Sequence, residues 1–176
     1  MRPILFTIAS LFLISSIASS QSISISMTVE SMVQGKFMAE SMRAKAVEKA
    51  NKIDVVSFAS ELTSPRDLAS GMATGKRQHK PLIIVKQSGA SSPQFFKAAV
   101  SNENLKKVVI EFYKTDSRMG QEALFYTITL EDASVANFRQ YTTDTNFFDE
   151  IKLTFRKITV ESATGKTMAM DDWTAQ

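Results

Sequence analysis

Residues 105–113 read LKKVVIEFY, and this stretch decides the fold class. Val108, Ile110 and Phe112 alternate with other residues, which is the two-residue period of a strand that buries one face. The same period recurs in residues 21–29, where serine or threonine alternates with larger apolar residues. A period of two, repeated along the chain, predicts a mainly β protein.

Other stretches share this character and are predicted to be strands: residues 53–63, 82–85, 124–130 and 148–160. In the first of them, Val56, Phe58 and Leu62 are expected to face the core. In the last, the apolar alternation changes phase, which predicts a β-bulge near Arg156 and Lys157.

One helix is clearly indicated. Ser92 is a good N-cap and Pro93 suits the first helical position, so the helix is predicted to start there. Phe96 and Val100 lie four residues apart on one apolar side, and the helix is expected to end near Asn102.

A second, short amphipathic helix is predicted over residues 38–51, which are rich in alanine, lysine and glutamate. Six or seven strands with one well-defined helix indicate a β-rich sandwich or barrel with one inserted helix.

The first twenty residues have the three parts of a secretory signal peptide. Arg2 gives a basic start, residues 4–17 are apolar or small, and residues 18–20 (ASS) offer a cleavage site before Gln21. The predicted organisation is therefore a signal peptide, residues 1–20, followed by one domain, residues 21–176. A first core strand or an uncleaved anchor is the alternative for this segment.

The composition excludes several kinds of chemistry. The chain has no cysteine and one histidine, so thiolate sites and multi-histidine metal sites are not expected, nor is any cofactor. A formal net charge of +3 gives no basis for a dominant nucleic-acid or membrane surface. His79 is the only candidate general base, and it is expected to be a solvated loop residue because no orienting acid or nucleophile is near it in sequence.

The polar segment 69–80 contains two glycines and the densest basic cluster of the chain: Lys76, Arg77, His79 and Lys80. It is predicted to be an exposed loop. No aromatic residues alternate with these cations, as stacking on bases would require. The cluster is either a solvated loop or a contact for an acidic partner surface.

Several motifs resemble one known family, the haemolysin-coregulated proteins (Hcp), the tube proteins of bacterial type VI secretion. They run in order along the chain: residues 75–82 (GKRQHKPL), Ser92-Pro93 with Lys97-Ala98, 108–113 (VVIEFY), 126–133 (YTITLEDA), 155–159 (FRKIT) and 171–173 (DDW). The resemblance implies a compact antiparallel β-barrel of two sheets with one short α-helix packed beside it. It implies no enzyme activity.

The resemblance also implies assembly. Members form homohexameric rings that stack into a tube, which is wrapped by a sheath, capped by a spike protein, and able to carry small effectors. The segment 69–80 matches the extended loop of the family. Lys76, Arg77, His79 and Lys80 are therefore the candidates for ring stacking, with Lys76, Arg77 and Lys80 expected to meet acidic residues of the adjoining ring.

Two features depart from the family pattern. Members usually carry no cleaved signal, and the family's usual loop is less helical than residues 38–51. An exported, free-standing barrel that acts as a surface-binding or adhesion module is thus the alternative function. An enzyme is a third and weaker one, because no catalytic set is visible.

Overall fold

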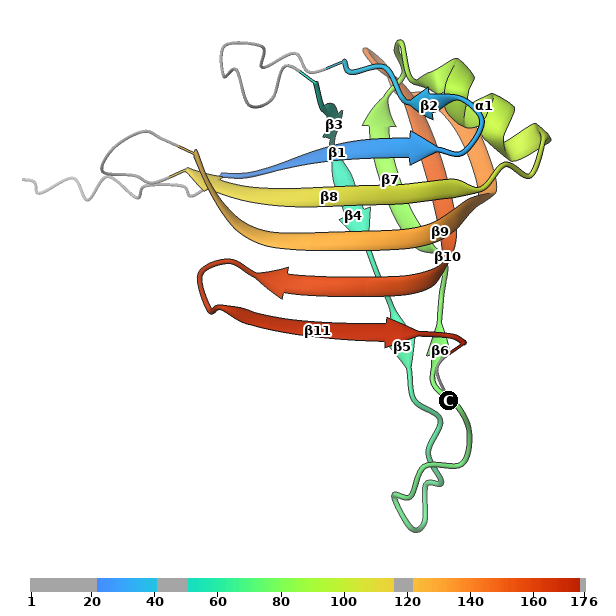
Figure 1. Ribbon diagram of the computed structural model, residues 1–176, viewed down its shortest axis with the longest axis vertical. Coiled ribbons are helices and arrows are strands. Elements are labelled where there is room, and N and C mark those ends of the chain that lie inside the picture. The colour runs from blue at the N-terminus through green and yellow to red at the C-terminus, as the bar shows by residue number, and fades with distance from the viewer. Residues whose placement is uncertain (1–21, 41–50, 116–121, 175–176) are drawn as a thin grey trace, which may run out of the picture.

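The computed structural model describes residues 22–40, 51–115 and 122–174. These residues form one nine-stranded sheet, one two-stranded sheet and one helix (Figure 1). In chain order the elements are β1 (Ile23–Ser31), β2 (Gly35–Lys36), β3 (Ile53–Val55), β4 (Ser57–Ala59), β5 (Leu62–Thr63), β6 (Gln78–His79), β7 (Leu82–Gln87), α1 (Ser92–Val100), β8 (Leu105–Thr115), β9 (Glu122–Thr142), β10 (Phe147–Ser162) and β11 (Thr167–Asp172). The mainly β class, the antiparallel pairing and the single short helix agree with the predicted fold.

The large sheet curls around one core. Its strand order is β2-β1-β8-β9-β10-β7-β4, with β11 beside β10 and β3 beside β1. β3 pairs with β1, β4 pairs with β7, and only Val56 separates β3 from β4. The Val56 N–H donates to the carbonyl of Val85 at 2.8 Å. Residues 53–59 therefore bridge the two sides of the curled sheet.

The helix α1 packs on this core. Phe95 and Ala98 are fully buried, and the Phe95 ring meets Phe37 edge-on at 4.9 Å. Phe96 and Val100, the apolar pair predicted from sequence, are mostly exposed instead. Because Phe95 and Ala98 face the core, the opposite side of α1, which carries Phe96 and Val100, faces solvent.

The predicted strand 53–63 is three short strands rather than one. β3, β4 and β5 pair with β1, β7 and β6 respectively. The buried residues are Ile53 and Val55, whereas Val56 and Leu62 are exposed and Phe58 is only partly buried. The predicted phase was wrong because the segment changes partner twice and leaves the core after Ala59.

Strands β8, β9 and β10 share a crease, where the residues facing the core change phase. Leu105 and Val108 on β8, Leu130 and Ala133 on β9, and Leu153 and Ile158 on β10 are buried on either side of it. Each of these pairs is separated by an odd number of positions, which period two alone does not allow.

The predicted bulge at Arg156 and Lys157 is not the cause of this change. The β9–β10 register is constant there and shifts instead between Lys152 and Leu153. At the crease, Asp132 on β9 adopts φ 49°, the left-handed conformation, and Arg156 donates to its carboxylate at 2.8 Å. The phase change was predicted correctly, but the bulge was not: the register is continuous there, and a left-handed residue, Asp132, lies opposite Arg156 on β9.

The N-cap of α1 is Ser91, one residue before the predicted cap. Pro93 still lies in the first turn, and the helix ends close to Asn102 as expected. Ser92 is helical, and its hydroxyl is used in a buried polar cluster described below.

The predicted helix 38–51 falls largely on residues 41–50, which lie outside the described residues, and Met38–Glu40 are not helical. The predicted signal peptide, residues 1–20, also lies outside them. Within the described residues, no helix has the length and apolarity needed to cross a membrane.

Candidate functional site

A hairpin built from β5 and β6 projects from the body of the molecule and contains the predicted basic loop (Figure 1). Leu62 pairs with His79, and the Lys80 N–H donates to the Glu61 carbonyl at 3.0 Å. Further out, Arg66 and Ala73 form an isolated bridge. The prediction that residues 69–80 are exposed is confirmed except at His79, and the segment forms one side of a two-stranded arm with short β pairing.

The base of this arm is attached to the last strand. Arg77 donates from Nε to the carboxylate of Asp171 at 2.5 Å, and its other nitrogen also contacts that carboxylate. His79 Nε2 lies 2.7 Å from Asp171 Oδ2. We call these three side chains, Arg77, His79 and Asp171, the hairpin clasp.

His79 is not the solvated residue that was predicted. Only 9% of its side chain is exposed. Its ring lies 5.3 Å from the ring of Phe155 and 5.5 Å from that of Trp173, between centroids. The prediction failed because Asp171 and Trp173 are more than ninety positions away along the chain, and sequence proximity was the only criterion available.

The clasp has a clear electrostatic cause. The Arg77 guanidinium, together with the hydrogen bond to His79, lowers the pKa of Asp171 from 3.8 to about 2 despite partial burial. The same carboxylate raises the pKa of Arg77. The Asp171–Arg77 pair is consequently ionised at neutral pH.

A second ion pair supports the C-terminal end of β11. Arg156 contacts both Asp132 and Asp172 at 2.8 Å, and Asp172 in turn accepts from the N–H and hydroxyl of Thr174. Through Arg156, the crease and the end of β11 are joined.

The four predicted stacking residues thus divide into two kinds. Arg77 and His79 belong to the clasp, so their polar groups are engaged within the chain. Lys80 pairs with Glu61 at 2.6 Å on the exposed surface. Lys76 is exposed and, within the described residues, has no ion-pair partner. The structure brings two of the four together and leaves two facing solvent.

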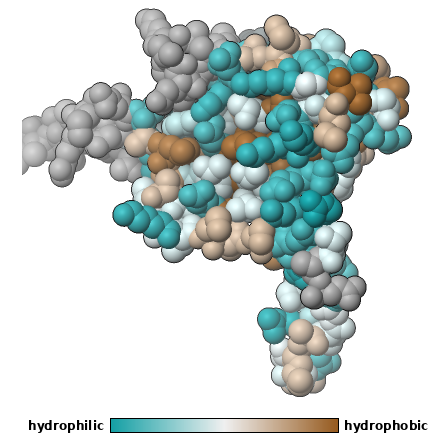
Figure 2. All heavy atoms as spheres, in the orientation of Figure 1, coloured by the Kyte–Doolittle hydropathy of each residue, from teal (hydrophilic) through white to brown (hydrophobic). Residues whose placement is uncertain are grey.

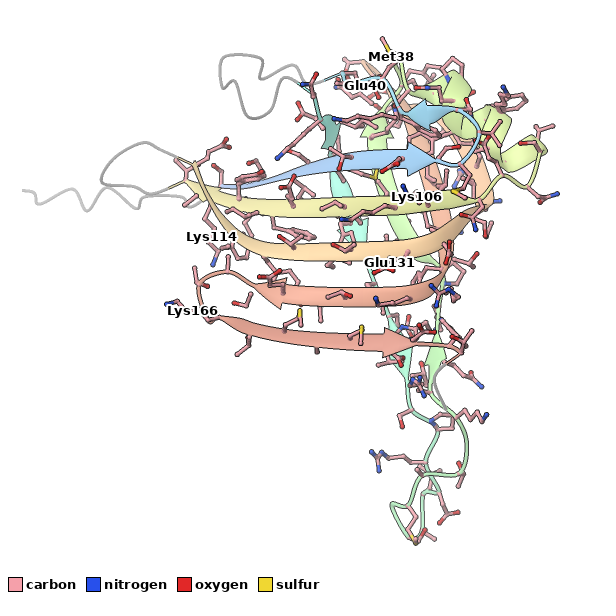
Figure 3. The ribbon with its side chains drawn as sticks, in the orientation of Figure 1. Met38, Glu40, Lys106, Lys114, Glu131 and Lys166 are labelled. Atoms are coloured by element: carbon pink, nitrogen blue, oxygen red, sulfur yellow. The ribbon has the colours of Figure 1, made fainter. Side chains whose placement is uncertain are left out.

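A buried polar cluster lies at the other end of the molecule, near Glu40 (Figure 3). Lys86 is fully buried and contacts Glu40, Asp149 (3.1 Å) and the Ser92 hydroxyl (3.2 Å). Asp149 also accepts from Ser88 at 2.5 Å.

Burial by itself disfavours the charged form of Asp149. Hydrogen bonds from Ser88, Ser92 and Gln140, together with the charge of Lys86, outweigh that effect and lower its pKa. The cluster ties β7, β10 and the start of α1 together.

The cluster could have been found in the sequence. Lys86 continues the buried alternation of Leu82 and Ile84, and Asp149 precedes that of Ile151 and Leu153. A lysine and an aspartate on core-facing positions of two strands indicate a buried pair.

Among the described residues, no group of three or more histidine, cysteine, aspartate or glutamate side chains is placed to hold a metal ion. The clasp and the buried cluster orient parts of the chain, and Lys76 and Lys80 of the projecting hairpin remain on the exposed surface.

A mainly β domain of this topology, with one helix and a projecting hairpin, is found in proteins of type VI secretion systems. The family model described as "Type VI secretion system effector, Hcp" matches residues 27–161. The Major exported protein of Pseudomonas aeruginosa PAO1 is 34% identical over 131 residues, covering 70% of this chain and 76% of that protein.

Solved structures agree with this match. A double mutant of Hcp1 from the E. coli EAEC 042 pathovar is 26% identical with a TM-score of 0.77, covering 86% of this chain and 99% of that one. The secreted protein Hcp3 of Pseudomonas aeruginosa is 26% identical with a TM-score of 0.73, covering 88% and 100%. The chain belongs to the Hcp family of type VI secretion system proteins.

Proposed function

We propose that this chain is a tube subunit: six copies form a ring, rings stack into a tube, and the tube carries small effectors. Membership of the Hcp family is the observation that carries the proposal. A spike protein at the tip and a sheath around the tube are the further partners it implies.

Two properties of the surface support assembly. β11 has one free edge within the described sheet, and its Met168 and Met170 are mostly exposed. An unpaired strand edge with apolar side chains favours contact with another chain. A side-by-side contact between different surfaces of identical subunits closes into a ring when the rotation allows it.

We further propose that the hairpin reaches the adjoining ring, with the clasp holding its direction. Lys76 and Lys80 are then the cations available to acidic groups across the contact, while Arg77 and His79 act from within the subunit. Replacing Lys76 and Lys80 together by alanine should reduce stacking most strongly at low salt, where charge interactions are least screened. An unchanged salt response of stacking in this variant would contradict the charge contribution.

Negative-stain electron microscopy of the purified chain tests the proposal. Rings with an open centre, alone or stacked, are expected. A strict monomer at high concentration would contradict the tube function and favour a free-standing surface-binding module instead.

A further inference from the structure

Lys86 is a lysine without access to water. Lysine is almost never fully buried in a folded protein, yet the side chains of Lys86 and of its partner Asp149 are both 0% exposed. Elsewhere the polar groups of the chain lie at the surface, and Figure 2 shows hydrophilic side chains spread over the visible face. Burying two charges is costly because both lose their hydration. Any step that removes both charges also removes that cost.

The sheet places the two side chains against each other. Lys86 on β7 and Asp149 on β10 are directly opposite in the antiparallel register, so they project from the same face. Lys86 Nζ lies 3.1 Å from Asp149 Oδ2, beside the carboxyl group. Two groups fixed in this way react with a far higher effective concentration than the same groups free in solution.

Hydrogen-bond donors surround the carboxyl group of Asp149. Oδ1 accepts from the Ser88 hydroxyl at 2.5 Å and from Gln140 Nε2 at 2.8 Å. Oδ2 accepts from the Ser92 hydroxyl. Two donors on one oxygen stabilise the negative charge that develops there when a nucleophile adds to the carboxyl carbon. Oδ1 is therefore the oxygen prepared to carry that charge, and Oδ2 is the one free to leave.

Glu40 brings a second carboxylate to the lysine (Figure 3). Its Oε1 contacts Lys86 Nζ and accepts from the Ser91 hydroxyl, and its Oε2 accepts from the Ser91 N–H at 3.2 Å. Gly89 leaves room for this carboxylate, since a Cβ there would overlap Glu40 Oε2. A carboxylate held on the amine nitrogen is placed to take a proton from it.

We propose that Lys86 and Asp149 form an intramolecular amide bond once the chain has folded. One proton first passes from the Lys86 ammonium to Asp149 Oδ2, which gives a neutral amine and a neutral carboxylic acid. Desolvation disfavours both charges, so this neutral pair lies closer in free energy to the ion pair than it does in water.

The bond then forms in two steps. The lone pair of Lys86 Nζ adds to Cγ of Asp149 while the carbonyl electron pair moves onto Oδ1, and Glu40 takes a proton from Nζ. The electron pair on Oδ1 next re-forms the carbonyl as the Cγ–Oδ2 bond breaks, and Oδ2 leaves as water with the proton that Glu40 returns. Nothing is oxidised or reduced, and no co-reactant is needed.

The polar groups of the product already have partners. The amide oxygen is Oδ1, which keeps its donors Ser88 and Gln140, and the remaining amide N–H faces Glu40. A cavity of about 510 Å³, lined in part by Glu40 and Ser88, gives the released water a way out. The bond links β7 to β10 within one subunit, so the inference does not depend on the proposed tube function.

Mass spectrometry of the purified, unmodified chain tests the proposal. In a tryptic digest, peptides 78–97 and 140–152 should appear as one joined species, lighter than their sum by one water, with no cleavage after Lys86. Lys52 and Glu111 are the internal control: they also pair, at 2.7 Å, but their side chains are 16% and 17% exposed, so their peptides should stay separate. Peptides 78–97 and 140–152 found only apart would overturn the inference.

Variants assign the roles. Lys86→Arg and Asp149→Ala remove the nucleophile and the carboxyl carbon, so neither should give the joined species. Glu40→Gln keeps the size of the side chain but cannot take the proton, so the rate of joining after refolding should fall by about tenfold or more. Glu61→Gln, at an exposed pair with Lys80, should join at the unmodified rate. Joining in Lys86→Arg would overturn the bond assignment, and an unmodified rate in a folded Glu40→Gln chain would overturn the role of Glu40.

Discussion

Asp171 is the residue that turns a basic loop into a directed arm. Its single carboxylate contacts both Arg77 and His79, and only about a quarter of its side chain is exposed. Charge-assisted hydrogen bonds of this kind are stronger than neutral ones, although partial exposure to water weakens them.

Asp171→Asn should weaken the clasp while leaving the main sheet intact. We expect a loss of about 1 kcal/mol in the free energy of opening the hairpin base, which corresponds to about fivefold faster trypsin cleavage after Lys76 and Arg77. Asp144→Asn is the control, because Asp144 lies exposed in the turn after β9. Equal cleavage rates in the two variants would refute the role of the clasp.

The clasp should also depend on pH in a defined direction. The pKa of Asp171 is lowered to about 2 from 3.8, so its contribution to stability is fully present above about pH 4. As the pH falls from about 4 through 2, the carboxylate becomes protonated and that contribution is lost. The protection of the backbone amides of residues 76–80, measured by hydrogen exchange relative to the intrinsic rate at each pH, should fall over this window in the unmodified chain and not in Asp171→Asn.

Lys86 differs from the partly exposed clasp residues because its side chain is fully buried. Lys86→Met should destabilise the fold by about 3 kcal/mol, since Asp149 would keep its buried charge without a cation. Chemical denaturation measures this loss. Lys106→Met is the control: its pair with Glu30 at 3.0 Å is exposed, so a change below about 1 kcal/mol is expected. Similar losses for the two variants would contradict the importance of burial.

At the crease, the long strands β8, β9 and β10 bend around the core. β9 and β10 span 21 and 16 residues, and a straight strand of that length would extend beyond a core of this size. Changing phase at Asp132 keeps apolar residues inward on both sides of the bend.

The conformation of Asp132 can be separated from its charge. Asp132→Asn should retain the left-handed conformation and cost little, because the exposed pair with Arg156 is weak. Asp132→Ala should cost about 1–2 kcal/mol, since alanine tolerates that conformation poorly. Equal stability of the two variants in denaturant would contradict the need for the left-handed backbone.

At the level of single elements, the sequence was informative where a strand keeps the same partners along its length. Residues 82–85 and 105–113 were predicted to be strands, and they lie in β7 and β8. Residues 53–63 alternate too, but they change partners twice, and no local pattern encodes that change. The helix α1 was located correctly, yet its buried side was misassigned, because Phe95 and Phe96 are equally apolar.

The candidate site shows the same limit. The basic residues of the hairpin could be identified from composition alone, but their roles could not. Arg77 and His79 contact Asp171, whereas Lys76 and Lys80 do not. Asp171 lies on β11, and the pairing of β11 with β10 brings it to the base of the hairpin. Long-range contacts of this kind appear only once the sheet is assembled.

The predicted signal peptide, residues 1–20, bears on the route of export. Cleavage of the predicted signal peptide would give an exported product that begins at Gln21. N-terminal sequencing of that product is the measurement. A product that begins at Met1 would contradict cleavage and leave the type VI route as the path of export.

As a whole, the molecule is a compact body with an arm at one end and an apolar surface at the other (Figure 1). Inside the chain, ion pairs of the clasp, the crease and the buried cluster hold the arm, the bend of the strands and the start of α1 in place. Large apolar side chains are exposed on β11, among other places, and the unpaired edge of β11 is a surface that copies of the chain would share.

Native mass spectrometry of the purified chain measures whether copies assemble. A tube subunit should give a dominant species of six times the subunit mass, with multiples of that mass at higher concentration. A single-subunit mass that persists at every concentration would contradict it.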